Sequence, residues 1–229
     1  MTTVLLATIS HSITFCEKTR RWVPSRMYQR VIVPDDPAEK IEPTHLHDFS
    51  LHWDAPDAYM GGGITVLDAL SRMHKHEARF SSADVAVIGG RPRSLNKLPS
   101  DIAAGINEAS VVSDYLTSIY GVETTHVINT AQTLDDEISA LLRLAESYDD
   151  VYVIMMDHRL WKYRLALQAA LRSRPAHELT SRKILLHGAL QYLPDYINEI
   201  VTIQGSAAYK RTMEREYHET VNLIARLNK

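Results

Sequence analysis

The sequence predicts one α/β domain, a three-layer α/β/α sandwich built around a mostly parallel sheet. From Asp84 onward, short β-rich runs alternate with long amphipathic runs, which is the pattern of consecutive βαβ units. The length of 229 residues suits one such domain better than two. Hydrophobic residues make up 45% of the chain and charged residues 23%, so the whole chain is expected to fold. Together these observations favour a Rossmann-like arrangement.

Short apolar runs rich in β-branched residues mark the expected strands. In chain order they are Val4–Ile9, Arg30–Val33, Asp84–Ile88, Thr125–Ile128, Val151–Met156, Lys183–His187 and Ile200–Ile203. Residues 34–60 show no clear period, and we interpret them as an irregular loop or cap within a single domain, 1–229.

Apolar residues at three- and four-residue steps mark the expected helices. They are Ile64–His76, Ile102–Tyr120, Thr133–Tyr148, Arg159–Arg172 and Ala207–Leu227. The spacing of Thr133 and Asp136 fits a capping box, which specifies where the helix at Thr133–Tyr148 begins.

The composition argues against several classes of protein. Lys and Arg number 25 against 28 Asp and Glu, and a net charge of −3 offers no basic surface to nucleic acid. Cys16 is the only cysteine, which excludes an internal disulfide and favours a reducing, cytoplasmic location. No apolar stretch reaches membrane length and the first one lacks a basic flank, so we expect neither secretion nor a membrane span. The signature motifs of P-loop ATPases, dinucleotide dehydrogenases, serine hydrolases and zincins are absent.

The most informative segment is the strand at Asp84–Ile88, which runs into Gly89, Gly90, Arg91 and Arg93. Glycines at the end of a strand let a ligand approach the backbone, and arginines bind carboxylate or phosphate. Ligands of open α/β sheets bind beyond the carboxyl ends of strands, so we expect these residues to bind ligand. In that case Gly90→Val should block binding with little loss of fold. A tight turn with two solvated arginines is the alternative.

Two helix starts add further polar groups. Glu108 lies in the helix after the diglycine, where it is either a catalytic carboxylate or a solvated helix residue. Thr130, Gln132 and Thr133 lie between a strand and a helix, where side-chain donors and the helix N-terminus can bind an anion. Capping alone explains Thr133.

A fourth segment follows the apolar strand at Val151–Met156 and carries Asp157, His158, Arg159 and Lys162. His158 is a candidate for proton transfer, and the other three are candidates for ligand binding. A structural histidine is the alternative. In a parallel sheet every strand-to-helix loop emerges at one edge, so we expect the four segments to share that edge. Strand order decides whether they meet in one pocket, as the family resemblance described next suggests.

These segments also resemble, in their order, the motifs of the SanA/YdcF-like family of uncharacterised α/β proteins. The matching stretches are Gly89-Gly90, Asn107-Glu108-Ala109, Gly121-Val122, residues 130–136 and residues 157–162, within about residues 84–172. The resemblance implies a Rossmann-like fold and, in some relatives, a link to cell-envelope biogenesis. Arg159 stands in the place of the family's histidine, with His158 one residue earlier. If that histidine transfers a proton in the family, this chain lacks it or has shifted it.

The sequence therefore predicts a site for a small anionic molecule at the C-terminal edge of the sheet. A nucleotide, a nucleotide-sugar, S-adenosylmethionine or a phosphorylated metabolite would suit it, and an enzyme is the favoured interpretation, with no reaction or cofactor assigned. The alternative is a non-catalytic interaction or assembly protein, such as a homodimer, that uses the aromatic and histidine-rich segment 46–59. His45, His47 and His52 could hold a metal, but their pattern fixes no ligand number or geometry, so we predict none.

Overall fold

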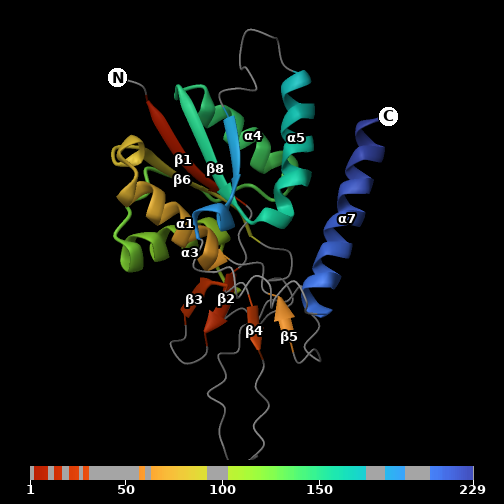
Figure 1. The fold of residues 1–229 in the computed structure, drawn as a ribbon, viewed down its shortest axis with the longest axis horizontal. Helices are drawn as coiled ribbons and strands as arrows, with labels where there is room; N and C mark the ends of the chain where they lie inside the picture. Colours follow the sequence, from red (N-terminus) through yellow and green to blue (C-terminus); the bar gives the residue numbers. More distant parts are fainter. Residues whose placement is uncertain are drawn as a thin grey trace, which may run out of the picture.

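The computed structural model describes residues 3–9, 13–16, 21–25, 28–30, 57–59, 63–91, 103–173, 184–193 and 207–228. Within them, a five-stranded parallel sheet has the strand order β7-β6-β1-β8-β9 (Figure 1). Its strands are β1 (Val4–Ile9), β6 (Asp84–Ile88), β7 (His126–Ile128), β8 (Asp150–Met155) and β9 (Ile184–Gly188). The predicted parallel sheet is confirmed, and the strand predicted at 200–203 lies outside the described residues.

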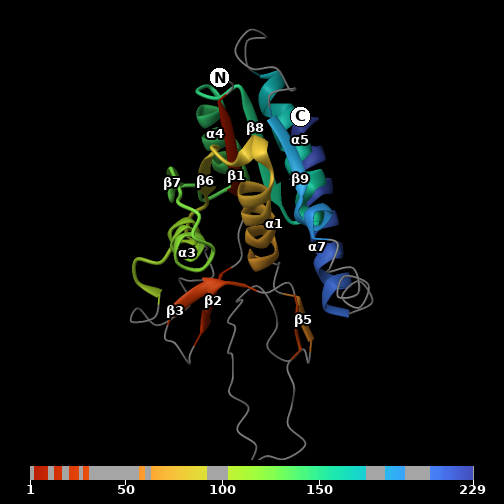
Figure 2. The ribbon, with the colours of Figure 1, turned by 60° about the vertical axis from the view of Figure 1, so that its left-hand side comes forward.

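Helices cover both faces of this sheet (Figures 1 and 2). On one face pack α1 (Gly63–His76) and α3 (Glu108–Tyr115), and on the other pack α4 (Leu134–Ala145) and α5 (Leu160–Arg172). The central strand β1 is buried from Leu5 to Ile9, as expected for a parallel strand covered on both sides. The α/β/α sandwich is therefore confirmed.

The strand order reverses between β1 and β8. Strands β6 and β7 lie to one side of β1, and β8 and β9 lie to the other. The helix that follows β1 covers one face of the sheet, whereas α5, which follows β8, covers the opposite face. This is a topological switch point, the place where open α/β sheets bind ligands.

Short 3₁₀ segments complete the loops. They are η1 (Ala78–Phe80), η4 (Asp157–Arg159) and η5 (Ala189–Tyr192). Because η4 lies between β8 and α5, it carries residues 157–159 directly past the C-terminal edge of the sheet.

The helix predicted at Ile102–Tyr120 begins later than predicted. Its first regular turn starts at Glu108, because the extended Asn107 caps it and accepts a hydrogen bond from the Ser110 N–H at 2.8 Å. Before the cap, Gly105 has a φ of +71°, which no helix contains. After Tyr115 the chain continues as a π-helical turn, η3 (Leu116–Tyr120).

The N-terminal third contains pairings that the sequence did not indicate. Strands β2 (Ile13–Cys16) and β3 (Arg21–Pro24) pair antiparallel, as do β4 (Tyr28–Arg30) and β5 (Asp57–Tyr59). The strand predicted at 30–33 therefore overlaps β4 by one residue, and 31–33 lie outside the described residues. Of the segment 34–60, only β5 is described.

The last helix, α7 (Ala207–Leu227), is confirmed in its predicted extent. Its amphipathicity is unusual, because its buried residues are Thr212, Glu216 and Leu223. Large apolar side chains lie exposed instead, namely Met213, Tyr217, Val221, Ile224 and Leu227. Among the described residues, no helix is both long and apolar enough to cross a membrane.

Candidate functional site

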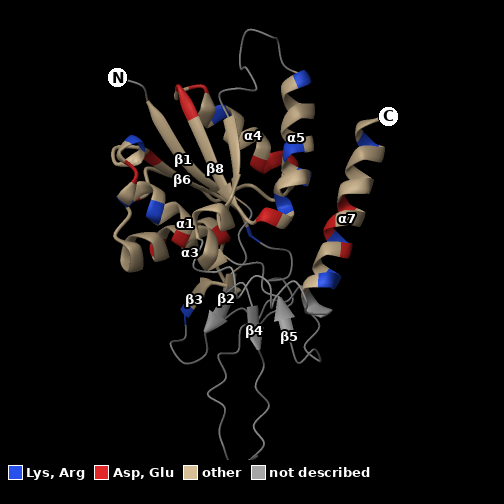
Figure 3. Cartoon of the chain, viewed as in Figure 1, with Lys and Arg blue, Asp and Glu red and all other residues tan. Residues whose placement is uncertain are grey.

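Charged side chains from four helices converge at the switch point. We call the following residues the switch-point cluster: Glu108 of α3, Glu137 of α4, Arg159, Lys162 and Tyr163 around the start of α5, and Glu216 and Glu219 of α7. Figure 3 shows basic residues on α5 and residues of both signs on α7, and the two helices are in contact. The starts of α3, α4 and α5 lie at the carboxyl edge of the sheet, and the contact of α7 with α5 adds Glu216 and Glu219 to that edge.

Arg159 is the central cation of the cluster. Only 15% of its side chain is exposed, and its Nε lies 3.9 Å from Oε1 of Glu216, whose side chain is 6% exposed. Burial alone would lower the pKa of the guanidinium, but the negative charges of Glu216, Glu108 and Glu137 raise it overall. Arg159 therefore stays charged and balances buried carboxylates.

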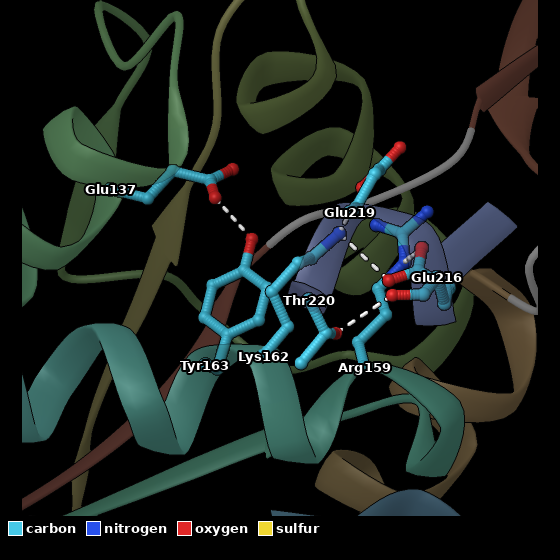
Figure 4. A network of polar contacts seen from close by, with 7 residues as sticks. All are labelled: Glu137, Arg159, Lys162, Tyr163, Glu216, Glu219 and Thr220. Carbon is cyan, nitrogen blue, oxygen red and sulfur yellow. Dashed lines mark hydrogen bonds and ion pairs between the residues drawn. The ribbon is translucent and has the colours of Figure 1, made fainter. Parts of the chain in front are cut away.

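Lys162 is the second cation, and it is mostly buried as well. Its Nζ lies 2.7 Å from Oε2 of Glu216 and 2.6 Å from Oε2 of Glu219. Figure 4 shows the ammonium group of Lys162 and the guanidinium of Arg159 both reaching toward Glu216. Beside them, the hydroxyl of Tyr163 donates a hydrogen bond to the buried carboxylate of Glu137. A carboxylate of α7 thus occupies the position in which two cations could hold an anion.

A cavity of about 290 Å³ opens next to Lys162. Its remaining lining residues are Leu134, Glu219, Asn222, Leu223 and Arg226. This lining combines two apolar side chains with an amide and with charges of both signs, which is the composition of a small-molecule pocket.

Asp157 and His158 lie on η4 beside this cluster, and they play different parts. The Oδ2 of Asp157 accepts a hydrogen bond from the Leu190 N–H at 3.1 Å, so this carboxylate ties η4 to η5. Burial raises the pKa of Asp157. Burial also lowers the pKa of His158 well below 6.5, and the positive charges of Arg159, Lys162 and Arg215 lower it further. His158 is therefore neutral near neutral pH, and its protonated form is disfavoured.

The pKa of His158 gives a prediction about stability. The unfolded chain takes up a proton at His158 as the pH falls below 6.5, whereas the folded protein does not, so acid favours unfolding. This one group costs up to about 1.4 kcal/mol per pH unit below that value. We expect urea unfolding to show a smaller loss of stability between about pH 7.5 and about pH 5.5 in His158→Gln than in the unchanged protein.

His187→Gln provides the control, because burial and the charge of Arg79 also lower the pKa of His187, at a distinct place on β9. It should remove a separate part of the same pH dependence. The raised pKa of Asp157 acts with the opposite sign, since protonation of that group favours the folded state. An identical pH dependence in His158→Gln and the unchanged protein would contradict the neutral histidine.

Backbone atoms of neighbouring loops fill the space beside Gly89 and Gly90 in which a ligand was expected. The N–H of Gly89 donates to the carbonyl of Ile128 at 2.9 Å, and the carbonyl of Gly90 accepts from the N–H of Glu108 at 2.8 Å. A Cβ built on Gly90 would lie 1.8 Å from the carbonyl oxygen of Ala131. The expectation that Gly90→Val would leave the fold intact is therefore wrong. Gly90 lets two loops of the protein approach each other.

Arg91 also serves the loop. Its Nη1 donates hydrogen bonds to the carbonyl oxygens of Ala103 at 2.6 Å and Ile106 at 3.0 Å, which fixes the turn before α3. Arg93 lies outside the described residues, as does most of the segment 46–59 that carries the assembly hypothesis. The histidines weighed as metal ligands lie there too, and the described part of the chain contains no group of three metal-binding side chains.

The junction at Thr130–Thr133 is capped from within. Thr133 Oγ1 accepts from the N–H of Asp136 at 3.2 Å, and Asp136 accepts from the N–H groups of Thr133 and Gln132, each at 3.0 Å. The capping box is thus confirmed. The carboxylate of Asp136 accepts hydrogen bonds from the N–H groups of Gln132 and Thr133, so these groups are not available to an anion. Thr133 and the backbone of Gln132 therefore form the helix cap. The exposed Thr130 lines a separate cavity of about 320 Å³.

The chain was also compared with known proteins. No family model, curated protein or solved structure matches it. The resemblance to the SanA/YdcF-like family therefore stays a prediction.

The predicted site residues thus fall into three groups. Glu108, Asp157, His158, Arg159 and Lys162 lie at or beside the switch point. Gly89, Gly90 and Arg91 shape a loop, and the residues at the start of α4 form its cap. The first group can contact a ligand at the switch point, whereas the other two groups fix the backbone of neighbouring loops.

Sequence reasoning missed Glu137 and Glu216. Glu137 lies beside Ile138 and one turn before Leu141, on the apolar stripe of α4. Glu216 is likewise on the inward side of α7, one turn after the buried Thr212. A carboxylate in a buried stripe is a detectable signal, because such a group requires a partner. Only the fold identifies these partners, which are the Tyr163 hydroxyl for Glu137 and the basic pair at the start of α5 for Glu216.

Proposed function

We propose that this protein binds a small anionic molecule at the switch point, through Lys162 and Arg159. The observation that carries the proposal is the pair of largely buried cations just past the carboxyl end of β8, of which Lys162 also lines a cavity of about 290 Å³. Buried cations that face a cavity favour anionic groups, because little water competes for them. Leu134, at the start of α4, would pack against the carbon skeleton of the ligand.

Within this proposal, His158 and Glu108 are the candidates for proton transfer. His158 is neutral near pH 7 and lies on the same short turn as Arg159, where the negative charge of a bound molecule would offset the cations that lower its pKa and make it a better base. Glu108 lies within electrostatic range of Arg159, at the first turn of α3. The ligand class remains that of nucleotides, nucleotide-sugars, S-adenosylmethionine and phosphorylated metabolites, and the protein is then an enzyme or a binder of such a molecule.

Binding measurements with Lys162→Gln test the proposal. We expect some of these nucleotides, nucleotide-sugars, S-adenosylmethionine and phosphorylated metabolites to raise the melting temperature, because a ligand of the folded state stabilises it. Inorganic phosphate and succinate serve as minimal probes. In calorimetric titrations Lys162→Gln should weaken binding by about tenfold or more, since it removes a charge-assisted contact. The matched control is Lys75→Gln, at an exposed position near the end of α1. Equal affinities for the two variants would contradict the site.

A further inference from the structure

The contact between α7 and the switch point is mainly polar. Glu216 and Glu219 pair with Lys162, and Arg226 pairs with Asp135 at 3.2 Å. Among the side chains described on α7, Leu223 is the one buried apolar residue, and Tyr209 packs partly buried against the core. Exposed ion pairs such as Arg226–Asp135 contribute little to stability, so α7 is held less firmly than a helix docked by an apolar stripe.

Thr212 weakens this contact further. It is 3% exposed and lies one turn before Glu216, and its hydroxyl has no hydrogen-bond partner among the described residues. A buried hydroxyl without a partner destabilises the state that buries it, because the group has lost its hydrogen bonds to water. The inward side of α7 therefore carries a penalty that undocking would relieve.

The charges at the switch point leave no place for an added anion while α7 is docked. Arg159 and Lys162 supply two positive charges and face carboxylates of α7, and Arg159 also lies within electrostatic range of Glu108 and Glu137. Glu216 spans both cations, with one oxygen toward each. An incoming carboxylate or phosphate would need the same two partners, so it would compete with Glu216 directly.

We propose that α7 is a displaceable strap and that Glu216 holds the place of the ligand's carboxylate or phosphate group. This inference rests on the proposed function and adds its regulation. Binding then requires Glu216 to leave Arg159 and Lys162, and any partner that draws α7 away raises the affinity for the anion. By linkage, the anion loosens α7 to the same degree.

Two variants of α7 should change anion affinity in opposite directions. Glu216→Gln removes the competing charge, so titration with inorganic phosphate and with succinate should show about tenfold tighter binding, within the usual range of coupling between sites. Thr212→Val replaces the hydroxyl without a partner by a methyl group of the same shape, which should tighten α7 and weaken binding of both probes. Glu214→Gln is the control, because Glu214 is exposed on the same helix. The preferred probe tells whether the site takes carboxylate or phosphate.

Hydrogen exchange of the unchanged protein gives the second readout. Saturating phosphate or succinate should speed the exchange of amides in 207–228 and leave those of β1 and β8 unchanged. Unaltered affinity in Glu216→Gln, or slower exchange of α7 with ligand, would overturn the strap. If the strap is overturned but Lys162→Gln still weakens anion binding, the proposed function stands without the strap. If neither the unchanged protein nor Glu216→Gln binds either probe, both proposals are wrong.

Discussion

Gly90→Ala is expected to lower the free energy of unfolding by about 3 kcal/mol, the upper end of the cost of overpacking. A Cβ at this position would lie 1.8 Å from the carbonyl oxygen of Ala131 and 2.7 Å from its carbonyl carbon. Both are backbone atoms, so no side-chain rotation can relieve the overlap. The loops after β6 and β7 would have to separate, and the hydrogen bond from the Ala131 N–H to the Gly89 carbonyl, at 3.2 Å, would be strained.

Gly89→Ala is the matched control for this prediction. Its Cβ would meet Glu108 Cβ at 3.2 Å and the backbone nitrogen of Ala109 at 3.3 Å, which are tight contacts that small shifts can relieve. We expect it to cost about 1 kcal/mol, measured by denaturant unfolding under the same conditions. Equal losses in the two variants would mean that the loops after β6 and β7 do not approach as closely as described.

Arg159→Met should destabilise the protein by about 3 to 5 kcal/mol, the usual cost of removing one partner of a buried ion pair. The methionine keeps much of the apolar stem of arginine, so the loss comes mainly from the charge. Glu216 would then keep only Lys162 as a close cation, and Glu108 and Glu137 would lose the positive charge that acts on them.

A double-mutant cycle separates this electrostatic effect from lost packing. Adding Glu216→Gln to Arg159→Met should recover part of the stability, because it removes one of the carboxylates left uncompensated. Arg159→Lys should cost less than Arg159→Met, since it keeps the charge without the planar geometry. Strictly additive losses in the double variant would show that Arg159 and Glu216 do not interact.

The sequence predicts helices and strands well where a single local pattern determines them. Val4–Ile9 and Asp84–Ile88 are strands at the predicted bounds, because each is a continuous apolar run that only a doubly covered sheet can bury. The cap of α4 was predictable from Thr133 and Asp136, since a capping box is a local interaction. The late start of α3 was missed because apolar periodicity continues through the segment before its cap at Asn107.

The candidate site could be predicted only in part. The residues after β8 were identified because strand ends of parallel sheets share an edge. Their partners on α7 come from a segment more than fifty positions later, and no local pattern joins Glu216 to Lys162. The role of Gly90 also depends on strand order, since only adjacent β6 and β7 bring Ala131 against it.

The outward-facing apolar side chains and the ion pairs of α7 make this helix sensitive to dissolved salt. Ordinary salt screens the ion pairs that hold the helix, while strongly salting-out anions such as sulfate favour the burial of Tyr217, Val221 and Ile224 in any available contact. Chloride and sulfate of equal ionic strength should therefore act differently on the protein's solubility. Colloidal behaviour, usually a property of the whole surface, would here depend in part on a single helix.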